Sequence, residues 1–302
     1  MKFGKTTELD DIDFTLPALD QSYQRMLSGY PKKLELRLGA TGWGNTAWKG
    51  QIYPTKCKAD QFLHHYAANF DGIELNTTHY RIPSKDQVKK WAEQTPPSFR
   101  FSPKVLQYIS HSRDLSLSNL DRITEFCDHM LSFEDRLGTS FMQLPPHFTF
   151  DRWPVLEKFL RQWPQEVPLA LEFRHGSFFE PSHLDQITDT LLETKTYALI
   201  TDVAGDRSVL HTRIWGPETM IRFVGNAPHI SDQKRIEDWL IYLKILADAG
   251  LEKCYLFIHQ PDPSAVLHTT ESIYHKANQQ NLTTAEKKLI RYDANNSLLL
   301  FS

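Results

Sequence analysis

The sequence predicts an α/β fold, specifically a single (β/α)8 barrel of the TIM type with an N-terminal helical extension. Short apolar runs with period-two spacing recur eight times from residue 34 onward, and most are followed by a polar loop and a segment of helical periodicity. Such alternation implies parallel strands joined by right-handed crossovers, and eight units most simply close into a barrel. An open doubly wound sheet is the alternative, but the segment GATGWG at 39–44 lacks the GxGxxG spacing of its dinucleotide site.

The eight expected strands cover 34–40, 72–78, 99–104, 140–145, 169–175, 197–203, 220–226 and 254–260. Helical periodicity predicts helices within 59–70, 84–94, 118–133, 154–163, 182–194, 231–250 and 264–280. Ser84 and Ser231 occupy expected N-cap positions, and Gly250 occupies an expected C-cap position. Only the sixth connection, 204–219, lacks a clear helical pattern.

The chain is expected to divide at residue 30. Residues 1–30 should form an extension with one amphipathic helix, within 20–29, which Gly29 and Pro31 would end. The barrel should span 31–302, and its last segment, 281–302, should form a C-terminal extension.

Composition excludes several classes of protein. A net charge of −3 argues against a general nucleic-acid surface, so nucleic acid is not an expected partner. Cys57, Cys127 and Cys254 show neither a disulfide framework nor zinc-ligand spacing. The first residues carry acids and no apolar run, and no segment reaches the roughly 18 consecutive apolar residues of a membrane helix. A cytoplasmic protein with no membrane contact is therefore expected.

The polar face of each strand should point into the barrel, because the apolar face must cover the surrounding helices. In 169–175 this reasoning leaves Ala170, Glu172 and Arg174 inside, and in 72–78 it leaves Glu74 and Asn76 inside. It also directs inward Arg37, Ser102, Lys104 and Arg222, and, from strands with two partly apolar faces, Gln143, Asp202 and His259.

These side chains predict a polar ligand site at the C-terminal ends of the strands, where function resides in this architecture. Pairs such as Glu172 and Arg174 could simply satisfy each other, but burying so many charges costs several kcal/mol per ion before pairing, which favours a site. Arg174, Arg222 and Lys104 should bind an anionic or hydroxyl-rich small molecule. The catalytic candidates are Glu74, Glu172, Asp202 and Lys104, with the carboxylates moving protons.

Loop residues add further candidates. Trp43, Trp48, Tyr53 and Tyr80 lie in the first two βα loops, where they could stack on a sugar or pack their loops onto the scaffold. His111 follows the third strand. A divalent metal held by the inward acids and His259 is an alternative, but no HxxE, HxH or HExxH spacing supports it. The sequence requires no cofactor, and no residue is assigned as a metal ligand.

Six ordered segments resemble the successive motifs of the YecE-like family, domain of unknown function 72: GATGWGNTAWKGQIYP, FDGIELNTTHYRIPS, FRFSPKVLQYISH, FMQLPPHF, LALEFRHGSFF and ITDVAG. The resemblance covers residues 34–265. It implies a TIM-type barrel but no reaction, because the family is uncharacterised and only loosely likened to sugar isomerases. It maps the family's recurrent polar positions onto Glu74, Asn76, Tyr80, Arg81, Lys104, His111, Gln143, Glu172, Arg174, His175, Asp202 and Arg222. His259 and Gln260 stand where the family usually has asparagines.

The leading functional hypothesis is a barrel enzyme that acts by acid/base chemistry on a small anionic or polyhydroxylated substrate, as in isomerisation, epimerisation or hydrolysis. One alternative is a divalent-metal-dependent phosphoester hydrolase, whose substrate could include a nucleic-acid backbone. The other is a barrel that binds a ligand without turnover.

Overall fold

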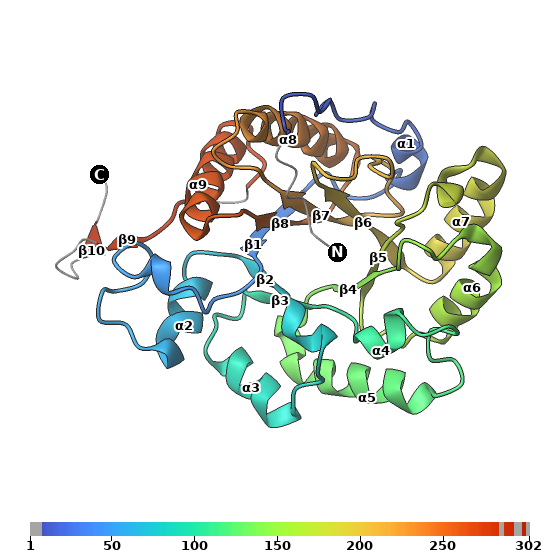
Figure 1. Cartoon of the computed structure of the whole chain (residues 1–302), viewed down its shortest axis with the longest axis horizontal. Coiled ribbons are helices and arrows are strands. Elements are labelled where there is room, and N and C mark those ends of the chain that lie inside the picture. The colour runs from blue at the N-terminus through green and yellow to red at the C-terminus, as the bar shows by residue number, and fades with distance from the viewer. Residues whose placement is uncertain (1–7, 284–286, 293–297, 300–302) are drawn as a thin grey trace.

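The computed structural model describes residues 8–283, 287–292 and 298–299, and it shows a ring of strands surrounded by helices (Figure 1). The eight parallel strands of the ring are β1 (Glu35–Ala40), β2 (Gly72–Leu75), β3 (Arg100–Pro103), β4 (Ser140–Gln143), β5 (Leu169–Glu172), β6 (Thr196–Asp202), β7 (Glu218–Val224) and β8 (Lys253–His259). Their order is β3-β2-β1-β8-β7-β6-β5-β4. Each predicted strand is therefore confirmed, and so is the barrel architecture.

The ring closes between β3 and β4 through a few backbone contacts. Val105 N–H donates to Phe141 O at 2.8 Å, and Gly138 N–H donates to Phe101 O at 2.7 Å. Parallel bridges also join Lys104 to Phe141 and Phe101 to Leu137. This closure brings Lys104, at the end of β3, beside the end of β4.

Helices occupy the predicted connections. They are α1 (Tyr23–Met26), α2 (Phe62–Ala67), α3 (Lys85–Glu93), α4 (Gln107–Ser110), α5 (Leu120–Met130), α6 (Trp153–Gln162), α7 (Pro181–Glu193), α8 (Ser231–Ala249) and α9 (Pro263–Gln279). Short 3-10 turns cover Thr46–Trp48, Ala59–Gln61, Asn76–His79, Leu131–Arg136, Phe150–Arg152 and Gly176–Phe179, and two further short strands are β9 (Arg291–Tyr292) and β10 (Leu298–Leu299). None of the described helices is long and apolar enough to cross a membrane.

Two of the three predicted caps are confirmed. Ser84 Oγ accepts the Gln87 N–H at the start of α3. Gly250 ends α8 with φ +123°, and a Cβ there would lie 2.7 Å from Leu27 O. The prediction for Ser231 is wrong, because Ser231 is already helical; the His229 Nδ1 accepts its N–H at 3.3 Å and supplies the side-chain acceptor instead.

No helix lies in the described connection between β6 and β7, as predicted, and the N-terminal segment fills this gap. We call residues 14–22 the strap. Thr212 Oγ1 accepts the Asp20 N–H at 2.9 Å and donates to Ala18 O at 2.8 Å, while Tyr242 OH donates to Pro17 O at 3.0 Å. Figure 1 shows α1, which directly follows the strap, between α8 and α7.

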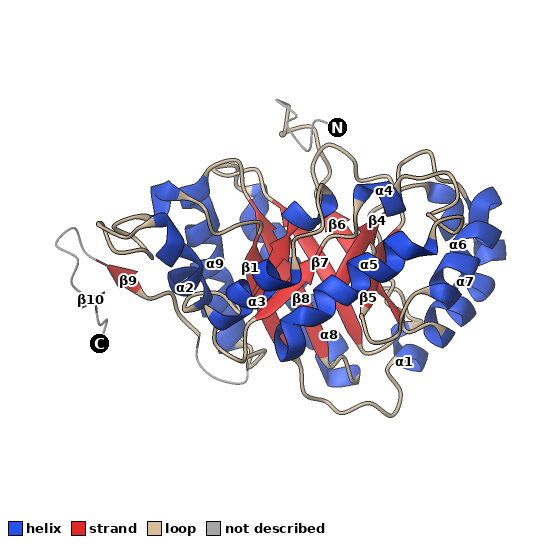
Figure 2. Ribbon diagram, turned by 90° about the horizontal axis from the view of Figure 1, so that it is seen from below, coloured by secondary structure: helices blue, strands red, loops and turns tan. Residues whose placement is uncertain are grey.

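The predicted helix within 20–29 is shorter than expected. Only Tyr23–Met26 is helical, and residues 17–20 form no regular element but bond to the β6–β7 connection through Thr212. The strap lies outside the ring of strands, where it contacts Tyr242 of α8 and Thr212 of the β6–β7 connection. In Figure 2, α1, which follows the strap, lies at the end of the barrel opposite α4. Residues 1–7 of the predicted extension lie outside the described residues.

The described part of the C-terminal segment packs near the start of β2. Lys287 Nζ lies 2.5 Å from Asp71 Oδ1, and Ile290 N–H donates to Asn69 Oδ1 at 2.6 Å. Of the predicted extension 281–302, residues 284–286, 293–297 and 300–302 lie outside the described residues.

The barrel interior holds its own apolar cluster, separate from the core between strands and helices. Its buried members are Phe141, Ala170, Leu199, Met220, Tyr255 and Phe257. Between this apolar cluster and the carboxyl ends of the strands, the barrel interior is polar.

Candidate functional site

A buried ion pair forms the centre of the polar interior. Glu74 on β2 is completely buried, and Arg222 on β7 is nearly so. The Arg222 Nε and Nη2 donate to Glu74 Oε2 and Oε1 at 3.1 and 2.9 Å. This two-point geometry is the strong, orientation-fixing form of an Arg–carboxylate pair. The inward direction predicted for both side chains is thus what the structure shows.

Glu74 is held as a permanent anion. Burial alone would raise its pKa, but the charges of Arg222 and His259, and their hydrogen bonds, hold the pKa of Glu74 well below its usual range. Burial opposes the charge of Arg222 as well, yet Glu74 and Glu172 raise its pKa. The pair therefore does not titrate near neutral pH, and Glu74 is better suited to positioning other groups than to moving protons.

Glu172, at the end of β5, joins this pair to the next strands. Its Oε2 accepts hydrogen bonds from Gln143 Nε2 at 2.6 Å and Thr201 Oγ1 at 2.9 Å. Arg222 Nη1 lies 3.6 Å from the same oxygen, and Arg174 Nε lies 3.4 Å from Oε1. Glu172 and Arg174 are therefore neighbours, as the sequence allowed, but Glu172 belongs to a larger network.

Lys104 stands at the edge of this network with a different environment. Its Nζ lies 2.5 Å from Gln143 Oε1 and 5.9 Å from the Phe141 ring centroid. Among the described residues, no carboxylate lies within ion-pair distance of Nζ. Burial first, and then the charges of Arg222 and Arg174, lower the pKa of Lys104 to about 8, although Glu74 and Glu172 oppose the shift.

Three further members of the site come from the end of β2, from β6 and from β8. Asn76, directly after β2, donates its Nδ2–H to Glu74 Oε1 at 2.9 Å, Thr201 on β6 contacts Glu172, and His259 Nε2 at the end of β8 lies 2.7 Å from Glu74 Oε2. Thr201 was missed from the sequence, whereas His259 was predicted to point inward and was considered as a metal ligand. We call the connected set the mouth network; its members are Glu74, Asn76, Lys104, Gln143, Glu172, Arg174, Thr201, Arg222 and His259.

The prediction that Asp202 points into the barrel is wrong. Its Oδ2 accepts from Trp239 Nε1 at 2.9 Å and from Arg235 Nε at 3.0 Å, and both partners belong to α8 outside the barrel. Arg207 Nη1 lies 2.5 Å from Oδ1. Because both faces of β6 are partly apolar, its pattern did not reveal that Leu199 and Thr201 are the inward residues.

The remaining predicted residues lie around the rim. Tyr80 is 77% exposed, and Arg81 and His111 are also exposed. The His79 ring, held by Nδ1 on Val105 O at 2.7 Å, lies 5.2 Å from Tyr80 and 5.5 Å from His111. Burial, with help from Lys104 and His111, lowers the pKa of His79 to about 4, so this ring is neutral.

Four loop residues predicted as possible contacts have local structural partners. The His175 Nδ1 accepts the Ser177 N–H at 3.2 Å and caps the turn Gly176–Phe179. Trp43 packs edge-on against Trp91, with ring centroids 5.6 Å apart. Trp48 and Tyr53 are buried in the core, so they are not available for stacking on a ligand.

The described residues contain no group of three or more His, Cys, Asp and Glu side chains that could hold a metal ion. Glu74 and His259 are close, but Asp202 lies on the other side of β6. Arg222 also occupies both oxygens of Glu74.

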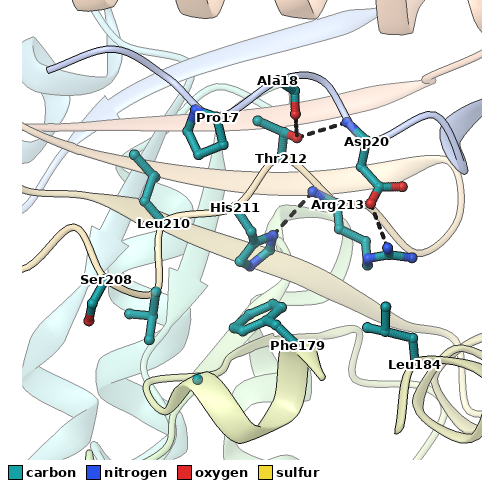
Figure 3. A pocket seen from close by; sticks show the side chains of 12 residues that line it. Pro17, Ala18, Asp20, Phe179, Leu184, Ser208, Leu210, His211, Thr212 and Arg213 are labelled. Carbon is teal, nitrogen blue, oxygen red and sulfur yellow. Dashed lines mark hydrogen bonds and ion pairs between the residues drawn. The ribbon is translucent and has the colours of Figure 1, made fainter. Parts of the chain in front are cut away.

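A separate cavity of about 330 Å³ lies between the strap and the β6–β7 connection. Figure 3 shows Phe179 beside the His211 ring and Asp20 paired with Arg213, whose Nη2 lies 2.5 Å from Asp20 Oδ2. Burial and the charge of Arg213 lower the pKa of His211 to about 4. The polar groups of this cavity chiefly bind the strap to the barrel.

Two known proteins are similar to this chain over about half to two thirds of its length. The UPF0759 protein YecE of Escherichia coli strain K12 is 29% identical over 219 residues, which is 66% of this chain and 79% of that protein. The UPF0759 protein YunF of Bacillus subtilis is 28% identical over 155 residues, covering 49% of this chain and 54% of that protein.

Solved structures agree with the fold. A DUF72 family protein of Enterococcus faecalis superposes with a TM-score of 0.66 at 19% identity, covering 84% of this chain and 98% of that one. A DUF72 family protein of Thermotoga maritima gives a TM-score of 0.54 at 23% identity, covering 74% and 92%. The model of the family described as protein of unknown function DUF72 matches residues 37–290, so the chain belongs to the DUF72 family.

Proposed function

We propose that the mouth network binds a small anionic or polyhydroxylated molecule and acts on it by acid/base chemistry, with Lys104 as the proton-transferring group. The observation that carries the proposal is the environment of Lys104, which is largely desolvated, is held by Gln143 and has a pKa of about 8. A lysine used only for stability is normally exposed or paired with a carboxylate.

The charge of the network supports an anionic ligand. Three cations, Lys104, Arg174 and Arg222, accompany the two carboxylates of Glu74 and Glu172. Partial desolvation, together with Lys104, His147 and Arg174, also lowers the pKa of His111, which reflects the positive surroundings of the rim. An anion bound near Lys104 would balance this excess, and Arg and Lys donors suit a phosphate or carboxylate.

The pKa of Lys104 supports proton transfer. A general acid or base works best when its pKa lies near the working pH, and the pKa of about 8 leaves an appreciable neutral fraction in that range. Glu74 is held ionised by Arg222, so the role of proton carrier predicted for it passes to Lys104.

The experiment that tests this proposal is a binding and exchange screen. Sugar phosphates, hydroxy acids and keto acids are first screened by thermal shift, and those that stabilise the protein are incubated with it in D2O and followed by NMR. We expect at least one anion to bind and to exchange a carbon-bound proton for deuterium. Lys104→Met should abolish exchange, whereas Lys89→Met, which removes an exposed lysine of α3, should not.

Other outcomes point elsewhere. Saturable binding without exchange or turnover would favour a non-enzymatic binding barrel. Binding of phosphoesters only with added Mg²⁺ or Mn²⁺, followed by hydrolysis, would favour the metal-dependent alternative. The proposal fails if no anion stabilises the protein, or if exchange survives in Lys104→Met.

A further inference from the structure

We infer that His259 is a second proton-transfer group of the mouth network, that Glu74 positions it, and that the ligand therefore carries a hydroxyl group as well as an anionic group. This inference rests on the proposed function, and it narrows the substrate class to hydroxylated anions.

The contact between His259 and Glu74 determines which ring nitrogen of His259 carries a proton next to the carboxylate. His259 Nε2 lies 2.7 Å from Glu74 Oε2. Because Glu74 is ionised, it can only accept, so the proton between the two atoms belongs to Nε2. Whenever the imidazole is in its neutral form, this Nε2 proton is its single N–H, and Nδ1 is then the acceptor.

The surroundings of His259 leave that acceptor available. No hydrogen-bond partner of Nδ1 occurs within the described part of the chain, and the side chain is 20% exposed. Glu74, by contrast, is immobilised by Arg222 and Asn76. A base oriented by a fixed carboxylate, with its second nitrogen open, is the arrangement that general-base histidines use.

The position of His259 determines which part of a ligand it would meet. His259 ends β8, while Lys104 follows β3, and β1 and β2 separate these strands in the ring. Lys104 and His259 therefore approach the network from different sides, with Glu74 on one of the intervening strands. A ligand whose anionic group lies by Lys104 and Arg174 would present another part to His259.

The proton transfer itself needs no further reactant. The hydroxyl O–H bond breaks, an Nδ1–H bond forms, and the oxygen keeps the electron pair. The imidazolium produced stands beside the Glu74 carboxylate, which stabilises its charge. Return of the proton to the substrate or product restores the neutral ring. A hydroxyl group is the donor that this acceptor recognises, and an apolar or purely anionic ligand offers none.

A structural role for His259 makes a different prediction. If the ring served only to satisfy Glu74, it would not distinguish ligands with and without a hydroxyl group. Two probes distinguish a proton-transfer role of His259 from a purely structural one. They are glycerol 1-phosphate and n-propyl phosphate, which share a phosphate and a three-carbon chain and differ in their hydroxyl groups.

The experiment titrates both phosphates into the full-length protein and measures dissociation constants by NMR. We expect wild type to bind glycerol 1-phosphate more tightly by roughly 3- to 10-fold, the value of one hydrogen bond. In His259→Leu the ratio should fall to about one, the loss expected when that hydrogen bond is removed, with n-propyl phosphate affinity changed by less than about twofold. His268→Leu, an exposed histidine on α9, is the matched control and should keep the wild-type ratio.

A second variant covers the case in which the leucine protein does not fold. His259→Asn keeps an N–H donor for Glu74 but removes the ring acceptor, and it should also lose the preference for glycerol 1-phosphate. Equal binding of the two probes by wild type, or a preference that survives both substitutions, overturns the role of His259 while leaving anion binding intact. Failure of wild type to bind either phosphate refutes the proposed function itself and this inference with it.

Discussion

Replacement of Lys104 by methionine should make the protein more stable while removing its function. Methionine has a similar length and no charge, so the substitution removes an ammonium group that the fold holds in a desolvated place. The buried contacts of its stem with the barrel interior are largely kept. A residue present for stability would give the opposite result.

The magnitude follows from the pKa of Lys104, which falls from the ordinary 10.5 to about 8 in the folded protein. The difference of about two and a half pH units corresponds to about 3 kcal/mol of unfavourable free energy at pH 7. The lost hydrogen bond from Nζ to Gln143 Oε1 offsets about 1 kcal/mol of the gain. Lys104→Met should therefore raise the free energy of unfolding by about 2 kcal/mol at pH 7.

The pH dependence gives a second, stricter test. Between pH 8 and pH 10.5 the unfolded chain binds more protons at Lys104 than the folded protein does, so wild-type stability rises with pH across this interval. The free-energy cost of the buried Lys104 ammonium is complete below its pKa in the folded protein, about 8, and absent above its pKa in the unfolded chain, 10.5. The advantage of Lys104→Met should consequently be largest at pH 7 and disappear by pH 10.5.

Urea unfolding of wild type and variant at several pH values between 7 and 10.5 measures this difference. Groups common to both proteins titrate equally and cancel. Lys89→Met, at an exposed position of α3, should stay within about 0.5 kcal/mol at every pH. A Lys104→Met protein that is less stable than wild type, or a gain that does not change with pH, would refute the reasoning.

Two further predictions concern the scaffold, and chemical denaturation measures both. Asp202→Ala should lower the free energy of unfolding by about 3–5 kcal/mol, because it leaves the completely buried Arg235 without its main carboxylate. The control Asp185→Ala, at an exposed position of α7, should change it by less than about 0.5 kcal/mol. A similarly small change for Asp202→Ala would contradict the structural role of Asp202. Gly250→Ala should cost about 1–3 kcal/mol, because of its positive φ and the 2.7 Å approach of its Cβ to a backbone oxygen. Gly42→Ala, where a Cβ meets nothing within 4 Å, should be neutral or slightly stabilising, and equal losses at the two glycines would contradict this account.

The sequence predicted the barrel well because the information is local. The composition of the chain changes within a few residues at each end of a strand, so short stretches of sequence identify the strands. The alternation of strand and helix then leaves only folds with parallel strands. The same local pattern shows the inward face wherever one face of a strand is polar. For this reason the inward direction was predicted correctly for Glu74 on β2, for Asn76 directly after it, and for Glu172 on β5.

The pattern is ambiguous where both faces of a strand are partly apolar: it predicted the inward direction of Gln143 on β4 and His259 on β8 correctly, and it failed on β6. On β6 the alternation is consistent with either orientation, and the helices outside decide between them. Arg235 and Trp239 of α8 provide a charge and an N–H donor for Asp202, so the acid turns outward and Thr201 turns inward. The strap shows the same limit, because nothing in its own sequence indicates that it replaces the missing sixth helix.

The sequence by itself thus determined the eight strands, their order of connection and the polar character of the barrel's carboxyl end. Only the tertiary structure decided which charges pair with one another. Glu74 meets Arg222 from 148 positions away and His259 from 185, and it was barrel closure that brought Lys104 beside Gln143 of β4. Such pairings depend on strand register and ring geometry, which no short stretch of chain contains.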